Sequence, residues 1–248
     1  MSNLNFCLIL TATIDPKGMT FLARNSIQDR LNDYKNAFEN WCKHDSINKI
    51  IFIENSGYDL TFFSDLSKKF KDKEIEIISS DVNNNFPRKL GKGYGESLCL
   101  QEIFDRSALA NKTNFFIAAT GRHYIKNINA VINEIKNKKK DIHLCLKDNL
   151  NYADTNFYAG SYSFFKNYIL PETKKTNDTI GKFFEHCVAD AALKAIVDGM
   201  TFGQLSTYAD IDGYIGTNNK KLRYNIFKKI KLFFFGKIKS YFFEHKKY

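Results

Sequence analysis

Apolar and polar residues alternate along the first 146 residues in a way that predicts strands and helices in turn. Continuous apolar runs, which are typical of buried parallel strands, occupy residues 5–13, 49–54, 74–79, 114–119 and 141–146. Between them, apolar residues recur at helical spacing over residues 26–43, 60–71, 97–109 and 125–137. This order predicts an α/β fold with a mainly parallel sheet and helices on both of its faces.

The regular alternation ends after residue 146. Residues 152–165 are polar and aromatic by turns, which favours an antiparallel strand and loop; such a row suits either sugar binding or ordinary core packing. Residues 177–197 have the spacing of a long helix, and residues 205–215 that of a last strand and turn. We therefore expect a smaller second part beside the parallel sheet.

These patterns predict one domain followed by a tail. The domain is residues 1–219, with the regular alternation at 1–146 and the smaller second part at 147–219. The tail, residues 220–248, contains ten basic residues and one acidic residue, so it carries +9 of the net charge of +10. The rest of the chain holds only about +1, which argues against a nucleic-acid partner for the body.

The tail interleaves lysines with large apolar residues. On a helix, one side would be lined by Phe227, Ile230, Phe234, Ile238 and Tyr241. A helix of this kind is typical of an interface with anionic lipid. Packing of the tail on the body and binding to single-stranded nucleic acid are the alternatives.

Composition excludes several other classes of protein. A hydrophobic fraction of 44% is enough for a sizeable core. Five scattered cysteines without a Cys-x-x-Cys pair indicate reduced thiols rather than a disulfide framework or a zinc site. No run is long enough to span a membrane, and the N-terminal apolar run is too short for a secretory signal.

A glycine-rich segment around residue 92 is the strongest candidate for a ligand site. Three glycines in five residues (Gly91, Gly93, Gly95) are flanked by the cations Arg88 and Lys92 and precede a predicted helix, whose N-terminus favours an anion. An ordinary glycine-rich turn with solvated lysines is the alternative. The strand at 114–119 then leads to a second glycine and a second cation, in Thr120-Gly121-Arg122.

Polar residues also close the first two predicted strands. Thr11 and Thr13 end the first strand, and Glu54 and Asn55 end the second. Ligands of open α/β sheets bind at the carboxyl ends of the strands. We therefore expect the threonines to line a nucleotide pocket and Glu54 and Asn55 to contact a ribose or a base, unless they only form turns.

Four short segments of the chain resemble a known family. Thr-Ala-Thr-Ile at 11–14, Glu-Asn-Ser-Gly at 54–57, Gly-Lys-Gly-Tyr-Gly-Glu at 91–96 and Thr-Gly-Arg at 120–122 resemble segments of bacterial surface-polysaccharide glycosyltransferases. These are small enzymes of O-antigen and capsule synthesis with a GT-A-like fold. The resemblance spans roughly residues 7–216. It implies a nucleotide-binding half at 1–146 and an acceptor half at 147–219. It also implies sugar transfer from a nucleotide-sugar donor to a polyprenyl-diphosphate-linked oligosaccharide.

The resemblance assigns donor binding to a set of residues spread over the first half of the chain. They are Thr11, Thr13, Glu54, Asn55, Arg88, Lys92, Gly93, Gly95, Glu96, Thr120, Gly121 and Arg122. It also implies an enzyme at the inner face of the cytoplasmic membrane, where a lipid-linked acceptor would meet the tail.

The sequence departs from the family at the metal-binding motif. Typical GT-A enzymes carry Asp-x-Asp where this chain has Thr120-Gly121-Arg122, and Asp210-Ile211-Asp212 comes about ninety residues too late. We therefore predict transfer without a metal cofactor, with Arg122, Lys92 and Arg88 meeting the charge of the leaving group. A monophosphate leaving group needs less compensation, so a CMP-sugar-dependent sialyltransferase is the alternative. A nucleotide- or nucleic-acid-binding module without catalysis is a further one.

An inverting transfer needs a group that takes the proton of the acceptor hydroxyl. Glu185 is the first candidate because, in this family, an acidic motif late in the domain supplies such a group. Asp154, His186 and Asp190 are the others. A solvated glutamate on an amphipathic helix is the alternative for Glu185.

Overall fold

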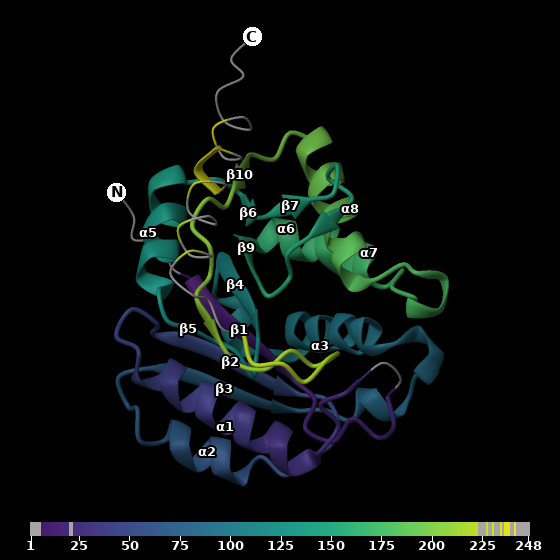
Figure 1. Cartoon of the computed structure of the whole chain (residues 1–248). Helices are drawn as coiled ribbons and strands as arrows, with labels where there is room; N and C mark the ends of the chain where they lie inside the picture. The colour runs from purple at the N-terminus through teal and green to yellow at the C-terminus, as the bar shows by residue number, and fades with distance from the viewer. Residues whose placement is uncertain are drawn as a thin grey trace.

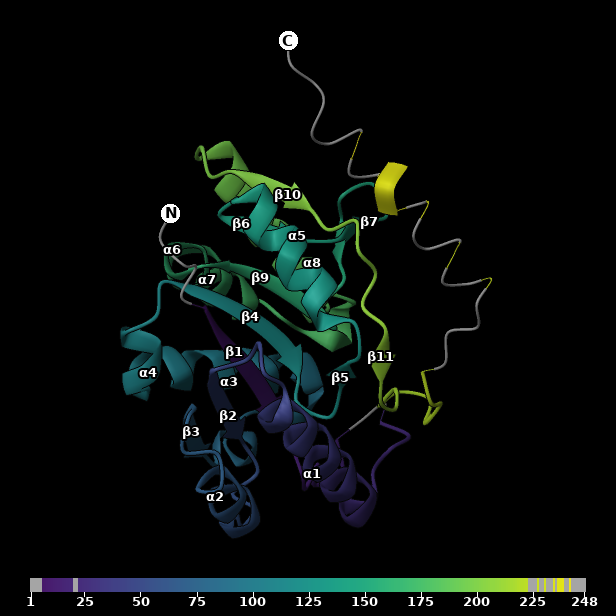
Figure 2. The ribbon, with the colours of Figure 1, turned by 90° about the vertical axis from the view of Figure 1, so that its left-hand side faces the viewer.

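A seven-stranded mixed sheet runs through the middle of the protein. The computed structural model describes residues 6–19 and 22–222, together with positions 227, 230, 234, 236–238 and 241. The strand order is β10-β6-β9-β4-β1-β2-β3, which Figure 2 shows from top to bottom. The strands are β1 (Phe6–Ala12), β2 (Lys49–Glu54), β3 (Glu74–Ser79), β4 (Phe115–Thr120), β6 (Ile142–Leu144), β9 (Phe157–Ser161) and β10 (Phe202–Gln204).

Six of these strands are parallel, and β9 is antiparallel to both of its neighbours, β4 and β6. The predicted strands at 49–54 and 74–79 are confirmed residue for residue. The antiparallel strand predicted within 152–165 is also confirmed, as β9. Because β9 inserts between β4 and β6, both parts of the chain share one sheet, and the predicted α/β fold class is confirmed.

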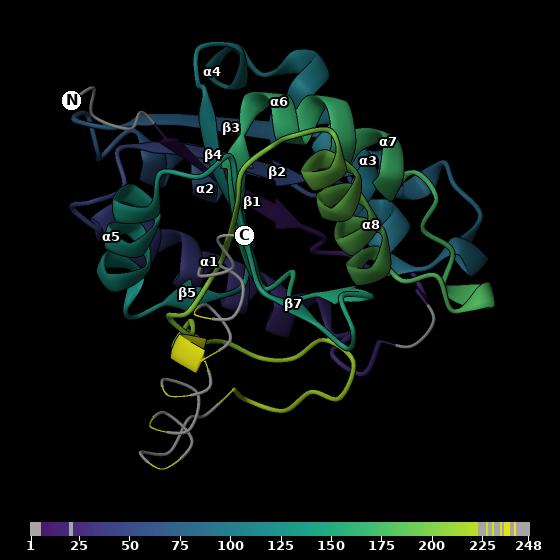
Figure 3. The same ribbon diagram turned by 90° about the horizontal axis from the view of Figure 1, so that it is seen from above.

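Helices cover both faces of the sheet, as Figures 1 and 3 show. One face packs against α1 (Ile27–Lys43), α2 (Thr61–Ser67) and α5 (Ile128–Lys138). The other packs against α3 (Lys92–Arg106), α4 (Ala108–Asn111), α6 (Tyr162–Phe164), α7 (Leu170–Thr173) and α8 (Phe184–Val197). Alternate residues of β1 enter the two cores, so Leu8 and Leu10 face α1 while Cys7 and Ile9 face α3.

Short elements complete the fold outside the central sheet. Two small antiparallel pairs form from β5 (Tyr124–Ile125) with β11 (Ile211–Asp212) and from β7 (Leu146–Lys147) with β8 (Tyr152–Ala153). The single-turn helices are η1 (Val82–Asn84), η2 (Arg88–Leu90) and η4 (Asp178–Ile180), and a π-helical stretch, Phe165–Ile169, joins α6 to α7. The five cysteines are reduced thiols, and all but Cys145 are buried.

Two helices do not begin at the residues that the sequence predicted. α3 begins at Lys92 rather than at residue 97, so the glycine-rich segment forms its first turn. α8 begins at Phe184 rather than at residue 177, because 177–182 closes on itself through η4 and a turn at Gly181 with φ of +72°. These two segments pack on each other: a Cβ on Gly93 would lie 2.8 Å from the Cβ of Phe184.

The C-terminal part of the fold also differs from the expectation. The strand and turn predicted at 205–215 are found only in part: the two-residue β11 lies within this range, while the strand of the central sheet, β10, comes earlier, at 202–204. Most of the predicted tail lies outside the described residues. Its described positions between 227 and 241 have helical backbone, and Gly236 lies close to the body, since a Cβ there would lie 2.0 Å from the carbonyl oxygen of Ser206. Within the described part of the chain, no helix combines the length and apolarity that a bilayer span requires.

Candidate active site

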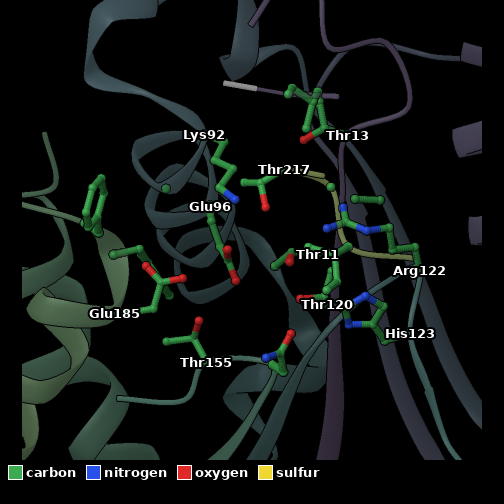
Figure 4. A pocket seen from close by; sticks show the side chains of 18 of the residues that line it. Thr11, Thr13, Lys92, Glu96, Thr120, Arg122, His123, Thr155, Glu185 and Thr217 are labelled. Carbon is green, nitrogen blue, oxygen red and sulfur yellow. The ribbon is translucent and has the colours of Figure 1, made fainter. Parts of the chain in front are cut away.

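A cavity of about 440 Å³ opens where the carboxyl ends of β1, β2 and β4 meet the first turns of α3 and α8. This volume lies within the range of about 300–1,000 Å³ that is usual for small-molecule sites. Of the predicted site residues, its lining includes Thr11, Thr13, Asn55, Lys92, Gly93, Glu96, Thr120, Arg122, Asp154 and Glu185. Figure 4 shows how several of them converge on it.

The wall made by the strand ends is held rigidly. The hydroxyl of Thr13 donates to Oδ1 of Asn55 at 2.7 Å, and Nδ2 of Asn55 donates to the carbonyl of Gly95 in α3 at 3.2 Å. Arg30 and the hydroxyl of Tyr34, both on α1, bind the backbone of Thr13 from behind. The loop after β1 is therefore fixed before any ligand enters, which lowers the entropic cost of binding.

Glu54 does not face the cavity. Its carboxylate is fully buried and accepts hydrogen bonds from the backbone N–H groups of Ile14 (2.8 Å), Ser56 (3.0 Å) and Tyr58 (3.0 Å). The hydroxyl of Ser56 donates to it as well. The structure therefore corrects our expectation of a ribose contact, because this carboxylate is already committed to joining the loops after β1 and β2.

Arg122 supplies a cation from the turn that follows β4. Its Nε donates to the carbonyl of Tyr214 at 3.0 Å, which fixes the guanidinium at the edge of the cavity. The neighbouring His123 is buried; burial and the charge of Arg122 lower its pKa to about 3, so its ring is neutral. Gly121 does not line the cavity, since its Cβ position lies 2.7 Å from the carbonyl oxygen of Thr11; the close turn between two strands requires glycine there.

The start of α3 supplies the second cation, Lys92, and the carboxyl group of Glu96. The glycines beside them allow other segments of the same chain to pack closely against this turn. Gly91, with φ of +85°, has the Asp178 side chain directly against it, and the Asp178 carboxyl also interacts with the backbone N–H of Lys92. The anion at this helix N-terminus is thus an internal one. Burial raises the pKa of Asp178, although the nearby Lys92 opposes that shift.

Two other residues of the glycine-rich segment are placed away from the cavity. Gly95 packs on Phe86 and Asn55, with its Cβ position 3.4 Å and 3.5 Å from their nearest atoms. Arg88 also lies near Phe86, with its guanidinium carbon 5.8 Å from the centre of the Phe86 ring. Neither residue lines the cavity, which corrects their expected roles in donor binding.

The opposite wall is acidic and aromatic. Glu185 lies in the first turn of α8, and burial, the charge of Glu185 and a hydrogen bond to its carboxyl raise the pKa of the Tyr152 hydroxyl. Asp154 is bound by Nζ of Lys147 at 2.6 Å and by Nδ2 of Asn156 at 2.9 Å. Burial opposes ionisation of Asp154, but these partners prevail and lower its pKa.

The remaining two candidate bases do not line the cavity. His186 accepts a hydrogen bond at Nδ1 from the backbone N–H of Phe183 at 3.1 Å, and its ring contacts Tyr152. Asp190 forms an ion pair with Lys182 at 2.5 Å. The structure corrects our expectation for both residues, because their polar atoms are used in holding the start of α8.

Glu96 differs from the other acidic residues of the cavity. It is half-buried, with its side chain directed into the cavity between α3 and α8. Burial and the charge of Glu185 raise its pKa to about 7, while Lys92 and Arg122 oppose that rise. At neutral pH this carboxyl group is therefore poised between its two protonation states.

Several lining residues were not predicted from the sequence. They are Arg30, Tyr34, Asn83, His123, Lys147, Tyr152, Thr155, Asn156 and Thr217. The polar and aromatic composition of 152–165 was a signal for Tyr152, Thr155 and Asn156. Thr217 follows β11 and lies across the cavity from Thr155 (Figure 4), a juxtaposition that has no local signature.

The resemblance of the sequence to GT-A enzymes implies a site for a divalent cation. Among the described residues, no three His, Cys, Asp or Glu side chains gather as a metal-ligand group. The late motif does not supply one, because Asp212 forms ion pairs with Lys126 (3.3 Å), which directly follows β5, and with Lys221 (3.4 Å), which lies beyond β11. The described residues therefore provide no such cluster of metal ligands at this cavity.

Comparison with known proteins places the chain only in general terms. No protein-family model and no curated protein matches it. Among solved structures it is similar to TarS of S. aureus, at 12% identity over 85% of this chain and 37% of that one, with a TM-score of 0.49. It is also similar to a cytidylyltransferase of Leptospira borgpetersenii, at 8% identity over 99% of both chains, with a TM-score of 0.47.

A third similar structure is core-mannan synthase A of Aspergillus fumigatus in its Mn/GDP form. The identity is 10% over 90% of this chain and 79% of that one, with a TM-score of 0.48. At such values the likeness concerns the general α/β arrangement. The case for a function therefore rests on the cavity.

Proposed function

We propose that the protein is a glycosyltransferase that uses a nucleotide-sugar donor. The observation that carries this proposal is the division of one cavity into two chemically different walls. Arg122 lines the cavity from the turn after β4 and Lys92 lines it from the start of α3, while Glu185 and Tyr152 line it from the first turn of α8 and from β8. Glu96 lies on α3 one turn after Lys92, on the side that faces Glu185 (Figure 4). Cations suit a phosphate, and a row of carboxyl and hydroxyl groups suits the hydroxyls of a sugar.

The donor phosphates lie, in this proposal, between Lys92 and Arg122. The two cations come from different elements, α3 and the turn after β4, so a phosphate between them is held from two directions. Their charge stabilises the leaving nucleotide as the bond to the sugar breaks. Thr11, Thr13 and Asn55 are then the nearest groups for the nucleoside.

Two cations suffice for a leaving group of small charge, which keeps a CMP-sugar donor, and hence sialyl transfer, as the second candidate. We propose metal-independent transfer for either donor class.

A thermal-shift panel tests these proposals directly. UDP, GDP, CMP and CDP are each added with EDTA and with Mn²⁺, since a ligand of the folded state raises the apparent Tm. We expect one nucleotide to raise the Tm equally in both conditions, and CMP to do so if the donor is a CMP-sugar. A shift that requires Mn²⁺ would contradict metal independence. No shift with any nucleotide would leave no support for the transferase.

We further propose that the acceptor is a lipid-linked oligosaccharide at the inner face of the cytoplasmic membrane. The support is the tail, where Phe227, Ile230, Phe234, Ile238 and Tyr241 expose between 48% and 78% of their surface at helical spacing. The net charge of +9 in residues 220–248 makes an anionic lipid surface the complementary partner.

Vesicle sedimentation tests the membrane proposal. We expect binding to vesicles containing phosphatidylglycerol and much weaker binding to pure phosphatidylcholine. Replacing Phe227 and Phe234 by serine keeps the charge and should release the protein. Val197→Ser, at a residue that is 85% exposed on the body, is the matched control. Equal binding by the tail variant and the control would refute the membrane role of this face.

A further inference from the structure

We propose that Glu96, on α3, is the catalytic base that takes the proton of the acceptor hydroxyl, and that Glu185, on α8, is a positioning residue facing it. This inference rests on the proposed function. It departs from the sequence analysis, which placed Glu96 among the donor-binding residues and Glu185 first among the candidate bases.

Glu96 lies one helical turn after Lys92, so both side chains project from the same face of α3. Figure 4 shows the Glu96 and Glu185 side chains entering the cavity from different helices. Glu96 thus lies next to the cation that would hold the donor phosphate, on the side that faces the acidic wall. A base for glycosyl transfer has to act between these two regions.

The carboxyl group of Glu96 does not hold any described segment of the fold in place. Within the described part of the chain, its oxygens take part in no hydrogen bond or ion pair, and only through-space charges act on it. Every other candidate is engaged: Asp154 by Lys147 and Asn156, and Glu185 by the Tyr152 hydroxyl. A carboxyl group without protein partners retains its lone pairs for a substrate hydroxyl.

Both charged and neutral side chains surround Glu96. Lys92 faces it from α3, Arg122 from the turn after β4, and Glu185 from α8. The neutral Cys99 of α3 and Tyr158 of β9 lie close enough for its charge to raise their pKa values. Burial and Glu185 together outweigh the two cations, and the resulting pKa of about 7 is matched to general base catalysis at neutral pH.

The reaction balances with this assignment. The oxygen of the acceptor hydroxyl forms a bond to the anomeric carbon of the donor sugar, and its proton passes to the ionised carboxylate of Glu96. The bond between the anomeric carbon and the phosphate oxygen breaks, and the nucleotide leaves with the electron pair beside Lys92 and Arg122. Glu96 then releases the proton to solvent. The nearby carboxyl group of Glu185 strengthens Glu96 as a base, because it raises the pKa of Glu96.

The experiment compares two isosteric variants with a matched control. Glu96→Gln and Glu185→Gln are measured beside Glu102→Gln, which changes an acidic residue of α3 outside the cavity. Nucleotide release from UDP-GlcNAc, GDP-mannose and CMP-sialic acid is followed between pH 5 and 9, with water as the acceptor. Nucleotide affinity is measured separately by calorimetry.

We expect the wild-type kcat to fall below about pH 7, as Glu96 becomes protonated. Glu96→Gln should lower kcat by about 10²- to 10⁴-fold, abolish this pH dependence and leave the nucleotide Kd unchanged. Glu185→Gln should move the acid limb to lower pH, because the like charge is removed. Glu102→Gln should behave as wild type.

Two results would overturn the assignment while leaving the transferase intact. One is a Glu96→Gln variant that retains its kcat and its pH dependence. The other is loss of kcat and of the acid limb in Glu185→Gln instead. If the wild-type protein neither binds a nucleotide nor releases one from a donor, the proposed function fails and the inference falls with it.

Discussion

Replacing Gly93 by alanine tests whether the glycine-rich segment serves the fold or a ligand. Gly93 lies in the first turn of α3, and a Cβ there would be 2.8 Å from the Cβ of Phe184, 3.1 Å from Cγ2 of Thr176 and 3.3 Å from the backbone nitrogen of Phe184. Two of these three atoms cannot move by rotation of a side chain. The start of α8 therefore has to shift.

The expected cost follows from two opposing effects. Alanine is favoured over glycine in a helix by up to about 1 kcal/mol, whereas an inserted methyl group in a packed contact costs about 1–3 kcal/mol. We therefore expect Gly93→Ala to lower the free energy of unfolding by about 1–2 kcal/mol. For a chain of this length that corresponds to a fall in Tm of about 2–8 °C.

Two further alanine variants separate crowding from backbone strain. Gly91→Ala combines a φ of +85° with a Cβ 2.6 Å from the Cβ of Asp178, so it should be more destabilising than Gly93→Ala. Gly181→Ala has a φ of +72° but nothing within 4 Å, so only the strain of about 1–2 kcal/mol applies.

Urea unfolding and nucleotide calorimetry on the same samples decide the question. We expect Gly93→Ala to be less stable than the wild type, and we expect the nucleotide affinity of the folded variant to change little. Unchanged stability together with loss of nucleotide binding would refute it. In that case Gly93 would exist to let a ligand approach the backbone, as the sequence analysis proposed.

Three further predictions concern single charged side chains. Arg122→Ala should weaken nucleotide binding by about 10- to 100-fold, through loss of a charge-assisted contact, whereas Arg106→Ala, on the exposed part of α3, should not; calorimetry measures both. Glu54→Gln should lower the free energy of unfolding by about 2–4 kcal/mol in urea melts, because an amide nitrogen would face backbone N–H groups. For Glu134, burial is outweighed by Lys138 and the N–H groups of 206–207, which lower its pKa to about 2. Its contribution of about 3 kcal/mol should be complete above pH 4.5 and lost as the pH falls towards 2. Glu134→Gln should therefore destabilise the protein at pH 7 but not at pH 2, and equal destabilisation at both would contradict the shift.

The sequence by itself determined the alternation of strands and helices and the edge where polar residues meet. Buried parallel strands are apolar throughout, so the runs at 49–54 and 74–79 were readable without a structure. Parallel strands also bring their carboxyl ends to one edge, which is why Thr11, Thr13 and Thr120 were expected together and do line one cavity. These features depend on local periodicity alone.

Only the tertiary structure decided which polar groups are free to act. Glu54 and Glu96 are both glutamates near predicted loops. The carboxylate of Glu54 accepts hydrogen bonds from backbone N–H groups, whereas the side chain of Glu96 is directed into the cavity. Glycine is required at positions 91 and 93 because a larger side chain would collide with Asp178, Thr176 or Phe184, which are more than eighty residues away in the chain. Burial and partners arise from contacts between distant segments. Residue type and spacing do not encode them, because the same side chain is a structural acceptor or a base depending on which groups surround it.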